Sequence, residues 1–202
     1  MAPKLSAAVL VGGESRRMGE NKALLKIDGK TLVERVVLLL QEVFAEVFLV
    51  GNDRERYRFL NLPVVGDVYR GCGPLAGVHA ALLAASHPYV FVAACDMPFL
   101  NRPAVAALLA EAPGRDAVVP KMGEYCEPLC AVYAKGCLPA VEEHLQKGIY
   151  KISALYPRLD VKFVEMDRVP DFNPEVGFFN VNTPEDLERA ASLFRRGCGG
   201  RK

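Results

Sequence analysis

A glycine-rich, basic segment near the start of the chain has the composition of a phosphate-binding site. It reads LVGGESRRMGENK from Leu10 to Lys22 and lies between two apolar stretches. Glycines let a backbone turn sharply and approach a ligand closely, and successive N–H groups in such a turn form a concave anion site. Arg16, Arg17 and Lys22 add positive charge at the same place. The segment therefore predicts a loop that binds a polyphosphate.

The spacing within this segment differs from two well-known phosphate-binding loops. In a Walker A loop a lysine directly follows the last glycine, whereas Lys22 is separated from Gly19 by other residues. Gly12 and Gly13 are adjacent, so the dinucleotide fingerprint G-x-G-x-x-G is absent as well. A P-loop GTPase is thereby excluded. An ordinary basic surface turn remains the alternative to a phosphate site.

A single carboxylate follows the most apolar stretch of the chain. Residues 95–98 read CDMP and come directly after Pro88–Ala94, a run typical of a strand that is covered on both faces. Mg²⁺ is commonly held by one or two carboxylates together with substrate phosphates and water. Asp96 is therefore the candidate Mg²⁺ ligand. The alternative is that Asp96 only stabilises the turn before Pro98.

A second glycine-rich loop is suited to the nucleoside part of a ligand. Gly66 and Asp67 end a short apolar stretch, and Gly71–Pro74 opens an alanine-rich helix. Free N–H groups at a helix N-terminus favour anions or carbonyl oxygens. Asp67 could bond to a nucleobase or a sugar, and its alternative is a solvated loop carboxylate.

Two asparagines precede the last predicted helix, within the sequence FFNVNTP. If Phe178–Val181 is extended, Asn180 and Asn182 lie on the same face of it. Their amide oxygens could then complete a metal or phosphate shell. Turn and capping chemistry is the alternative, and it is favoured for Asn182 taken alone.

Alternating strands and helices are expected to position these residues. The predicted strands are Leu5–Val11, Glu46–Val50, Pro63–Val65, Pro88–Ala94, Asp116–Val119, Glu127–Tyr133 and, at an edge, Val161–Val164. The predicted helices are Leu32–Phe44, Leu75–Ala85, Pro103–Glu111, Leu138–Gln146 and Pro184–Phe194. Thr31 with Glu34 has the spacing of a capping box, and Thr183 is a good N-cap. This order predicts a three-layer α/β/α fold with a mostly parallel sheet, which binds ligands beyond the carboxyl ends of its strands.

The composition suits one globular domain. The chain has 202 residues, is 51% hydrophobic and carries a formal net charge of +1, which gives no case for binding nucleic acid or a membrane surface. No apolar run reaches the ~18 residues of a membrane-spanning helix, and no signal-peptide pattern opens the chain. We expect one domain over residues 1–194, a disordered basic tail over residues 195–202, and a cytoplasmic location.

Cysteine and histidine do not form recognisable reactive sets. None of the six cysteines makes a Cys-x-x-Cys pair, so neither a zinc site nor a disulfide framework is expected. Cys126 and Cys130 are predicted to share a strand, where a spacing of four puts both side chains on one face. His79, His87 and His144 are interpreted as structural residues.

Together, these segments resemble the molybdenum cofactor guanylyltransferase family, a group within the Rossmann-like nucleotidyltransferases. The residues that carry the resemblance are 10–22, Asp67 with 73–77, 95–98, 127–133 and 179–187. The first segment is close to the family pattern L-A-G-G-x-S-x-R-M-G-x-D-K, with Val11 in place of the alanine and Asn21 in place of the aspartate. Asn21 removes a carboxylate beside Lys22, the position where the family pattern would allow an orienting ion pair.

The resemblance implies that GMP is transferred from GTP to a molybdopterin-type cofactor and that pyrophosphate is released. It implies catalytic roles for Arg16 and Lys22, which would neutralise the β and γ phosphates, and for Asp96, which would hold Mg²⁺. The implied GTP-binding residues are Leu10, Val11, Gly12, Gly13, Lys22, Asn52, Asp67, Gly73, Gly77 and Asp96.

The resemblance also bears on the second substrate and on partners. Asn180 and Asn182 would lie near that substrate or the metal, and residues 121–127 near its pterin. Besides GTP and the cofactor, it implies transient contacts with proteins of cofactor biosynthesis or molybdoenzyme maturation.

Two other functions remain open at this point. A molybdopterin cytidylyltransferase, or a related nucleotidyltransferase, is the nearest one, although the Gly12-Gly13 pair favours the guanylyl branch. A nucleotide-binding regulator without turnover is the other, and Asn21 is the only feature that suggests it. The retained Lys22 and Asp96 argue against such a regulator.

Overall fold

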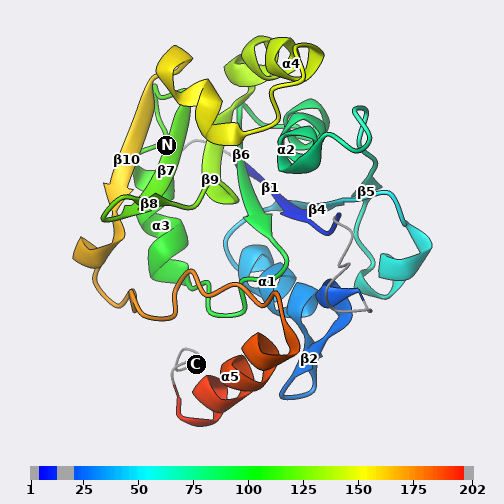
Figure 1. Cartoon of the computed structure of the whole chain (residues 1–202), viewed down its shortest axis with the longest axis vertical. Helices are drawn as coiled ribbons and strands as arrows, with labels where there is room; N and C mark the ends of the chain where they lie inside the picture. Colours follow the sequence, from blue (N-terminus) through cyan, green and yellow to red (C-terminus); the bar gives the residue numbers. More distant parts are fainter. Residues whose placement is uncertain (1–4, 13–20, 198–202) are drawn as a thin grey trace.

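One twisted sheet, flanked by helices on both faces, organises the chain (Figure 1). The computed structural model describes residues 5–12 and 21–197. The strand order in the main path of the sheet is β10-β7-β9-β6-β1-β4-β5. These strands are β1 (Leu5–Leu10), β4 (Glu46–Val50), β5 (Val64–Val65), β6 (Tyr89–Ala94), β7 (Ala117–Met122), β9 (Cys130–Ala134) and β10 (Val161–Glu165).

The sheet is mostly parallel, as predicted. Strand β1 pairs in parallel with both β4 and β6, and β5 and β10 also pair in parallel with their neighbours. Strand β9 runs antiparallel to both β6 and β7. A short strand, β8 (Tyr125–Cys126), returns antiparallel along β7. Strand β10 lies at the edge of the sheet, which confirms its predicted position.

The two faces of the sheet carry separate apolar cores. On β1, Ala7 and Val9 pack with α1 (Leu32–Gln41) and α3 (Arg102–Ala110). The alternate residues, Ala8 and Leu10, pack on the other face with α2 (Gly73–Ala84) and α4 (Leu138–Gln146). Because strand side chains alternate between faces, one short strand contributes to both cores. The predicted three-layer α/β/α architecture is confirmed.

A third, smaller core lies below the sheet in Figure 1. It joins α5 (Pro184–Arg195) to the hairpin of β2 (Lys26–Ile27) and β3 (Lys30–Thr31). Ile27, Leu32 and Ala190 are among its buried residues. The hairpin and this core were not predicted from the sequence.

Helix boundaries follow the capping residues closely. Thr31 and Glu34 form the predicted capping box of α1, and Thr183 caps α5 in a second box with Asp186. Helix α1 ends at Gln41 rather than at Phe44, which is buried and stacks on Phe91 outside the helix. Helix α2 begins earlier than predicted, at Gly73.

The predicted strand Glu127–Tyr133 is wrong in its first half. Strand β8 ends at Cys126, a turn follows in which the N–H of Cys130 donates to the carbonyl of Glu127 (3.2 Å), and β9 begins at Cys130. Pro128 lies in this turn, and proline cannot donate to a strand ladder. Cys126 and Cys130 therefore belong to different strands, and their predicted common face does not exist.

The C-terminal end of the described chain is helical. Helix α5 continues to Arg195, the first residue of the predicted tail, and residues 198–202 lie outside the described residues. Within residues 5–12 and 21–197, no helix has the length and apolarity needed to cross a membrane.

Candidate active site

The candidate residues gather where the parallel strands end. Strands β1, β4, β5 and β6 all run in the same direction, so the residues that follow them emerge at one edge of the sheet. Backbone hydrogen bonds continue the ladder there, from Val11 N–H to the Val50 carbonyl (2.9 Å) and from Cys95 N–H to the Leu10 carbonyl (3.2 Å). The structure thus brings the ends of these four strands together, as open parallel sheets do at a ligand site.

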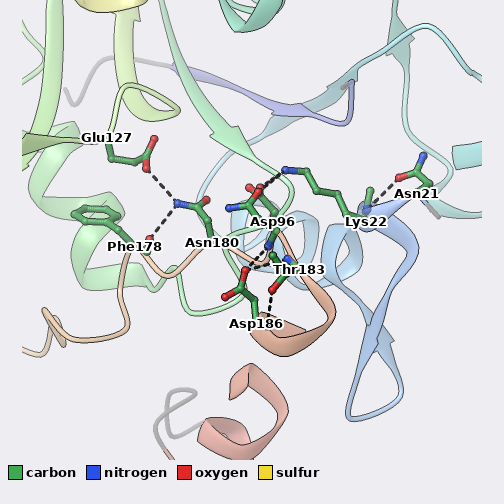
Figure 2. Close-up of polar contacts among 10 residues, drawn as sticks. Asn21, Lys22, Asp96, Glu127, Phe178, Asn180, Thr183 and Asp186 are labelled. Carbon is green, nitrogen blue, oxygen red and sulfur yellow. Dashed lines mark hydrogen bonds and ion pairs between the residues drawn. The ribbon is translucent and has the colours of Figure 1, made fainter. Parts of the chain in front are cut away.

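Lys22 and Asp96 form an ion pair at this edge (Figure 2). Lys22 is the first residue of a short 3₁₀ helix, η1 (Lys22–Leu24), and Asp96 follows β6. The side chain of Asp96 is only 7% exposed, so the lysine compensates a carboxylate that is largely removed from water. Lys22 Nζ also donates to Asn182 Oδ1 (3.2 Å). Three distant segments of the chain meet at this amine.

One oxygen of Asp96 has a different environment from the other. Oδ2 pairs with Lys22, whereas Oδ1 is buried without a hydrogen-bond partner in the described residues. A buried carboxylate oxygen without a partner is costly unless a donor or a cation completes it. The Asp96 backbone is held firmly, since its carbonyl accepts from Val181 N–H (3.0 Å). Asp96 therefore presents a fixed, unsatisfied oxygen that suits a divalent cation.

Asn21, where the chain departs from the family pattern, points away from Asp96 (Figure 2). Its Oδ1 accepts from Ala23 N–H (3.0 Å) and caps η1, and its Nδ2 donates to the hydroxyl of Tyr57 (2.9 Å). The Tyr57 hydroxyl in turn donates to the Val11 carbonyl (3.0 Å). Asn21 therefore ties the helix that carries Lys22 to the end of β1. The carboxylate that pairs with Lys22 is that of Asp96.

Tyr57 was not identified from the sequence. It lies in η2 (Glu55–Leu60), a stretch rich in charged residues, yet it is only 2% exposed. Burial is the largest effect on its hydroxyl and raises the pKa of Tyr57, so the phenol keeps the proton that it donates. A single aromatic residue inside a polar stretch was the only signal for it.

Asn52 and Asp67 form a reciprocal pair after β4 and β5. Asn52 Nδ2 donates to Asp67 Oδ2 (3.1 Å), and Asp67 N–H donates to Asn52 Oδ1 (3.0 Å). A side chain at Gly66 would approach Asn52 Oδ1 to 3.2 Å, so glycine leaves room for this pair. Asp67 Oδ1 is buried without a partner among the described residues. The pair fixes Asp67 and leaves one acceptor oxygen for a ligand.

The start of α2 lies beside this pair in the chain. Gly71 and Gly73 have φ of +75° and +68°, values that favour glycine, and Cys72 provides no side-chain cap. The first N–H groups of α2 are thus left for a ligand. Gly77 has a different role, because a Cβ there would meet the Leu10 side chain at 3.1 Å. It lets α2 pack closely against the end of β1.

The two asparagines of the FFNVNTP segment contact different partners, and they do not lie on a common strand face as predicted. The segment is irregular, with no strand between residues 176 and 182. Asn182 contacts Lys22, while Asn180 Nδ2 donates to Glu127 Oε2 (3.4 Å) and to the Phe178 carbonyl (3.1 Å) (Figure 2). Glu127, which is 6% exposed, is a buried carboxylate. The resemblance placed residues 121–127 near the pterin but gave Glu127 no role of its own.

Two predicted site residues, Gly13 and Arg16, lie outside the described residues. Leu10, Val11 and Gly12 are described and end at the site edge, and Leu10 and Val11 are buried. All other predicted residues lie at the carboxyl edge or, for Gly77, in the packing behind it.

An open α/β sheet whose parallel strands end in a lysine–aspartate pair and a glycine-opened helix defines a nucleotide-binding enzyme of the nucleotidyltransferase class. Comparison with known proteins places the chain more closely. The family model described as "MobA-like NTP transferase domain" matches residues 7–161, and the chain belongs to this family.

Individual relatives align with nearly the whole chain. A protein of Pelotomaculum thermopropionicum named "Probable molybdenum cofactor guanylyltransferase" is 41% identical over 97% of this chain and 96% of its own length. The "Molybdenum cofactor guanylyltransferase" of Desulfosudis oleivorans is 37% identical over 96% of this chain and 97% of its own length. The solved structure of molybdopterin-guanine dinucleotide biosynthesis protein A from Archaeoglobus fulgidus superposes with a TM-score of 0.81, at 34% identity, covering 95% of this chain and 99% of that one.

Proposed function

We propose that this chain is a molybdenum cofactor guanylyltransferase, which transfers GMP from GTP to a molybdopterin-type cofactor and releases pyrophosphate. The observation that carries the proposal is the Lys22–Asp96 pair at the carboxyl edge of the sheet. The names of relatives that align along nearly the whole chain support the choice of substrates.

The reaction exchanges one phosphorus–oxygen bond for another. The terminal phosphate of the cofactor attacks the α-phosphorus of GTP, and the bond to the β-phosphate oxygen breaks. A phosphate monoester has a second pKa of about 6, so the attacking oxygen needs no general base at neutral pH. The three histidines fit this picture, since each contacts groups of the scaffold: His79 contacts Glu142, His87 contacts Glu46, and His144 contacts backbone carbonyls.

Positive charge is needed where pyrophosphate leaves. Lys22 is positioned for this role by η1 and by its contacts with Asp96 and Asn182. We assign Arg16 to the same phosphates, and the backbone of Leu10–Gly13 to the cradle around them. Catalysis then rests on positioning and on neutralisation of the charge that develops in the transition state.

Asp96 is the residue that would hold Mg²⁺, through its buried and otherwise unpartnered Oδ1. The described residues contain no group of three or more His, Cys, Asp or Glu side chains arranged for a metal. A single protein carboxylate fits Mg²⁺, which takes its remaining ligands from phosphates and water. When bound, the ion would neutralise charge on the α-phosphate.

Asp67 and the start of α2 suit the guanosine part of GTP. The unpartnered Asp67 Oδ1 can accept from an N–H of the base or a hydroxyl of the ribose. Asn52 holds this carboxylate in place, and the backbone N–H groups of Leu75 and Ala76 in the first turn of α2 offer donors. The acceptor cofactor is assigned to the side of Asn180 and Asn182.

The proposal extends to the cellular setting. We place the reaction in the cytoplasm, where the five described cysteines would stay as the free thiols that they are in the structure. The labile cofactor would be handed over in transient contacts with proteins of its synthesis or of molybdoenzyme maturation. The function is tested by pyrophosphate release from GTP, compared with CTP, in the presence of Mg²⁺ and the molybdopterin acceptor.

A further inference from the structure

The amide of Asn180 can be oriented from the chemistry of its partners. Glu127 Oε2 and the Phe178 carbonyl are both acceptors, so the Asn180 atom that contacts them is the NH₂ group. An NH₂ group has two hydrogens, and these two contacts use both. The Asn180 carbonyl oxygen is then the part of the amide left for a ligand, and Asn180 acts there as an acceptor.

The amide of Asn182 is oriented the other way, with its carbonyl oxygen occupied and its NH₂ group left. The Lys22 ammonium can only donate, so it faces the Asn182 carbonyl oxygen, and the NH₂ group of Asn182 is left to donate. Phosphate oxygens accept hydrogen bonds, and they fit Asn182 but not Asn180. The partner of the Asn180 carbonyl oxygen is therefore an N–H group, an O–H group or a cation and not a phosphate, which excludes the phosphate part of the metal or phosphate shell suggested by the sequence.

An exposed aromatic ring belongs to the same network. The Tyr125 hydroxyl donates to Glu127 Oε2 (2.5 Å), the oxygen that also accepts from Asn180. The Tyr125 residue is nevertheless 52% exposed. Its ring is tethered at the hydroxyl while much of the side chain stays open to solvent. Burial of the hydroxyl, the Glu127 contact and the nearby Asp96 carboxylate raise the pKa of Tyr125, so the tether remains protonated.

Glu127 is the shared anchor of this network. It accepts from Tyr125 and Asn180 at Oε2 and from Leu129 N–H at Oε1 (3.2 Å). Both oxygens are occupied by donors and the residue is 6% exposed, so Glu127 itself has little room to contact a ligand. Its role is to position Tyr125 and Asn180.

We propose that Tyr125 and Asn180 bind the planar ring of the acceptor, with Glu127 as the residue that positions both. The ring stacks on Tyr125, and one of its N–H groups donates to the Asn180 carbonyl oxygen. A pterin provides both features, being a flat heteroaromatic ring with N–H donors on its edge. The choice of pterin rests on the proposed function, whereas the polarity of Asn180 and the exposure of Tyr125 do not.

Steady-state kinetics distinguish the contribution of the Tyr125 ring to acceptor binding from that of its hydroxyl. Stacking on an aromatic side chain is worth a factor of about ten or more in affinity per ring. Tyr125→Ala is therefore expected to raise the KM for the molybdopterin acceptor about tenfold, with the KM for GTP within about twofold of wild type. Tyr125→Phe keeps the ring and serves as the matched control, with an acceptor KM within about threefold. An unchanged acceptor KM in Tyr125→Ala would overturn the stacking role.

The positioning role of Glu127 is tested by a double-mutant cycle with Asn180. Glu127→Gln replaces one acceptor oxygen by a donor and is expected to raise the acceptor KM to a similar extent as Asn180→Ala, with kcat for GTP turnover at saturating acceptor largely kept. The rise in acceptor KM of the double variant should be smaller than the product of the two single effects, since both variants lose the Glu127–Asn180 hydrogen bond. Additive losses, or a loss in GTP affinity alone, would contradict the positioning role.

A fluorescence titration tests ring binding without turnover. The chain has no tryptophan, so Tyr125→Trp introduces a single reporter. A 6-substituted pterin monophosphate should quench it saturably, whereas Leu83→Trp, in the exposed C-terminal part of α2, should show no saturable quenching. Equal quenching of both reporters would overturn the ring site. Failure of wild-type protein to use GTP would instead reject the proposed function, and the titration would still decide this inference.

Discussion

Lys22 and Asp96, 74 positions apart in the sequence, form one ion pair because η1 and the end of β6 meet at the same edge of the sheet. The lysine is 26% exposed and the aspartate 7%, so the pair is partly shielded from solvent. It holds a cation and an anion together at the place where triphosphate and metal are assigned.

Lys22→Ala leaves the Asp96 carboxylate buried without its counter-ion. We expect a loss of stability of ~2 kcal/mol, below the range for fully buried pairs because Lys22 is partly exposed, and a fall in kcat/KM for GTP of at least about hundredfold. Chemical denaturation and pyrophosphate release measure the two effects. Adding Asp96→Asn to this variant removes the uncompensated charge. Stability should then recover while activity stays lost, and recovery of both would be incompatible with a catalytic role for the pair.

Tyr57→Phe removes a hydroxyl that links Asn21 to the Val11 carbonyl. Because Tyr57 is buried, the two groups lose a partner that water replaces poorly, and we expect a loss of ~1–2 kcal/mol in stability. The KM for GTP should rise, since η1 and the end of β1 are no longer tied together. Asn21→Ala removes the outer link and also the cap of η1, so it should destabilise the protein to a similar extent while leaving the bond from Tyr57 to the Val11 carbonyl in place. If Tyr57→Phe leaves both Tm and KM unchanged, the link does not position the nucleotide loop.

Glu46 gives the structure a specific response to acid. Burial works to raise its pKa, but hydrogen bonds from Ser6 and Ser86 and a contact with His87 outweigh it and lower the pKa of Glu46 from 4.5 to about 2. A depressed folded-state pKa stabilises the protein above pH 4.5, and this contribution is lost as pH falls toward 2. It amounts to ~2 kcal/mol after allowance for the partly exposed side chain. The Tm advantage of wild type over Glu46→Gln should shrink between pH 5 and pH 2.5, and a constant difference would show that Glu46 does not titrate this way.

The parts of the fold that depend on local sequence were predictable. Thr31 and Thr183 mark helix starts because their side chains cap the next turn, whatever lies farther away. The apolar runs that became β1 and β6 indicated buried strands, and alternation with helices was enough to place Asp67 and Asp96 at one edge.

Residues whose role depends on distant partners were not predictable in the same way. Tyr57 and Glu127 are defined by contacts with Asn21 and Asn180, which lie 36 and 53 positions away. The pairing of Lys22 with Asp96, rather than with a neighbour at position 21, likewise depends on the tertiary fold. Which end of each amide is free to bind a ligand, for Asn180 and Asn182, could be assigned only once their partners were known.

Nucleotide choice tests the central claim most directly. Wild-type protein, Mg²⁺ and molybdopterin acceptor are incubated with GTP or CTP, and pyrophosphate release is measured for each nucleotide. A site built around hydrogen bonds to one base rejects the other strongly, so kcat/KM should favour GTP by at least about hundredfold. Equal use of both nucleotides, or a preference for CTP, would contradict the assignment as a guanylyltransferase.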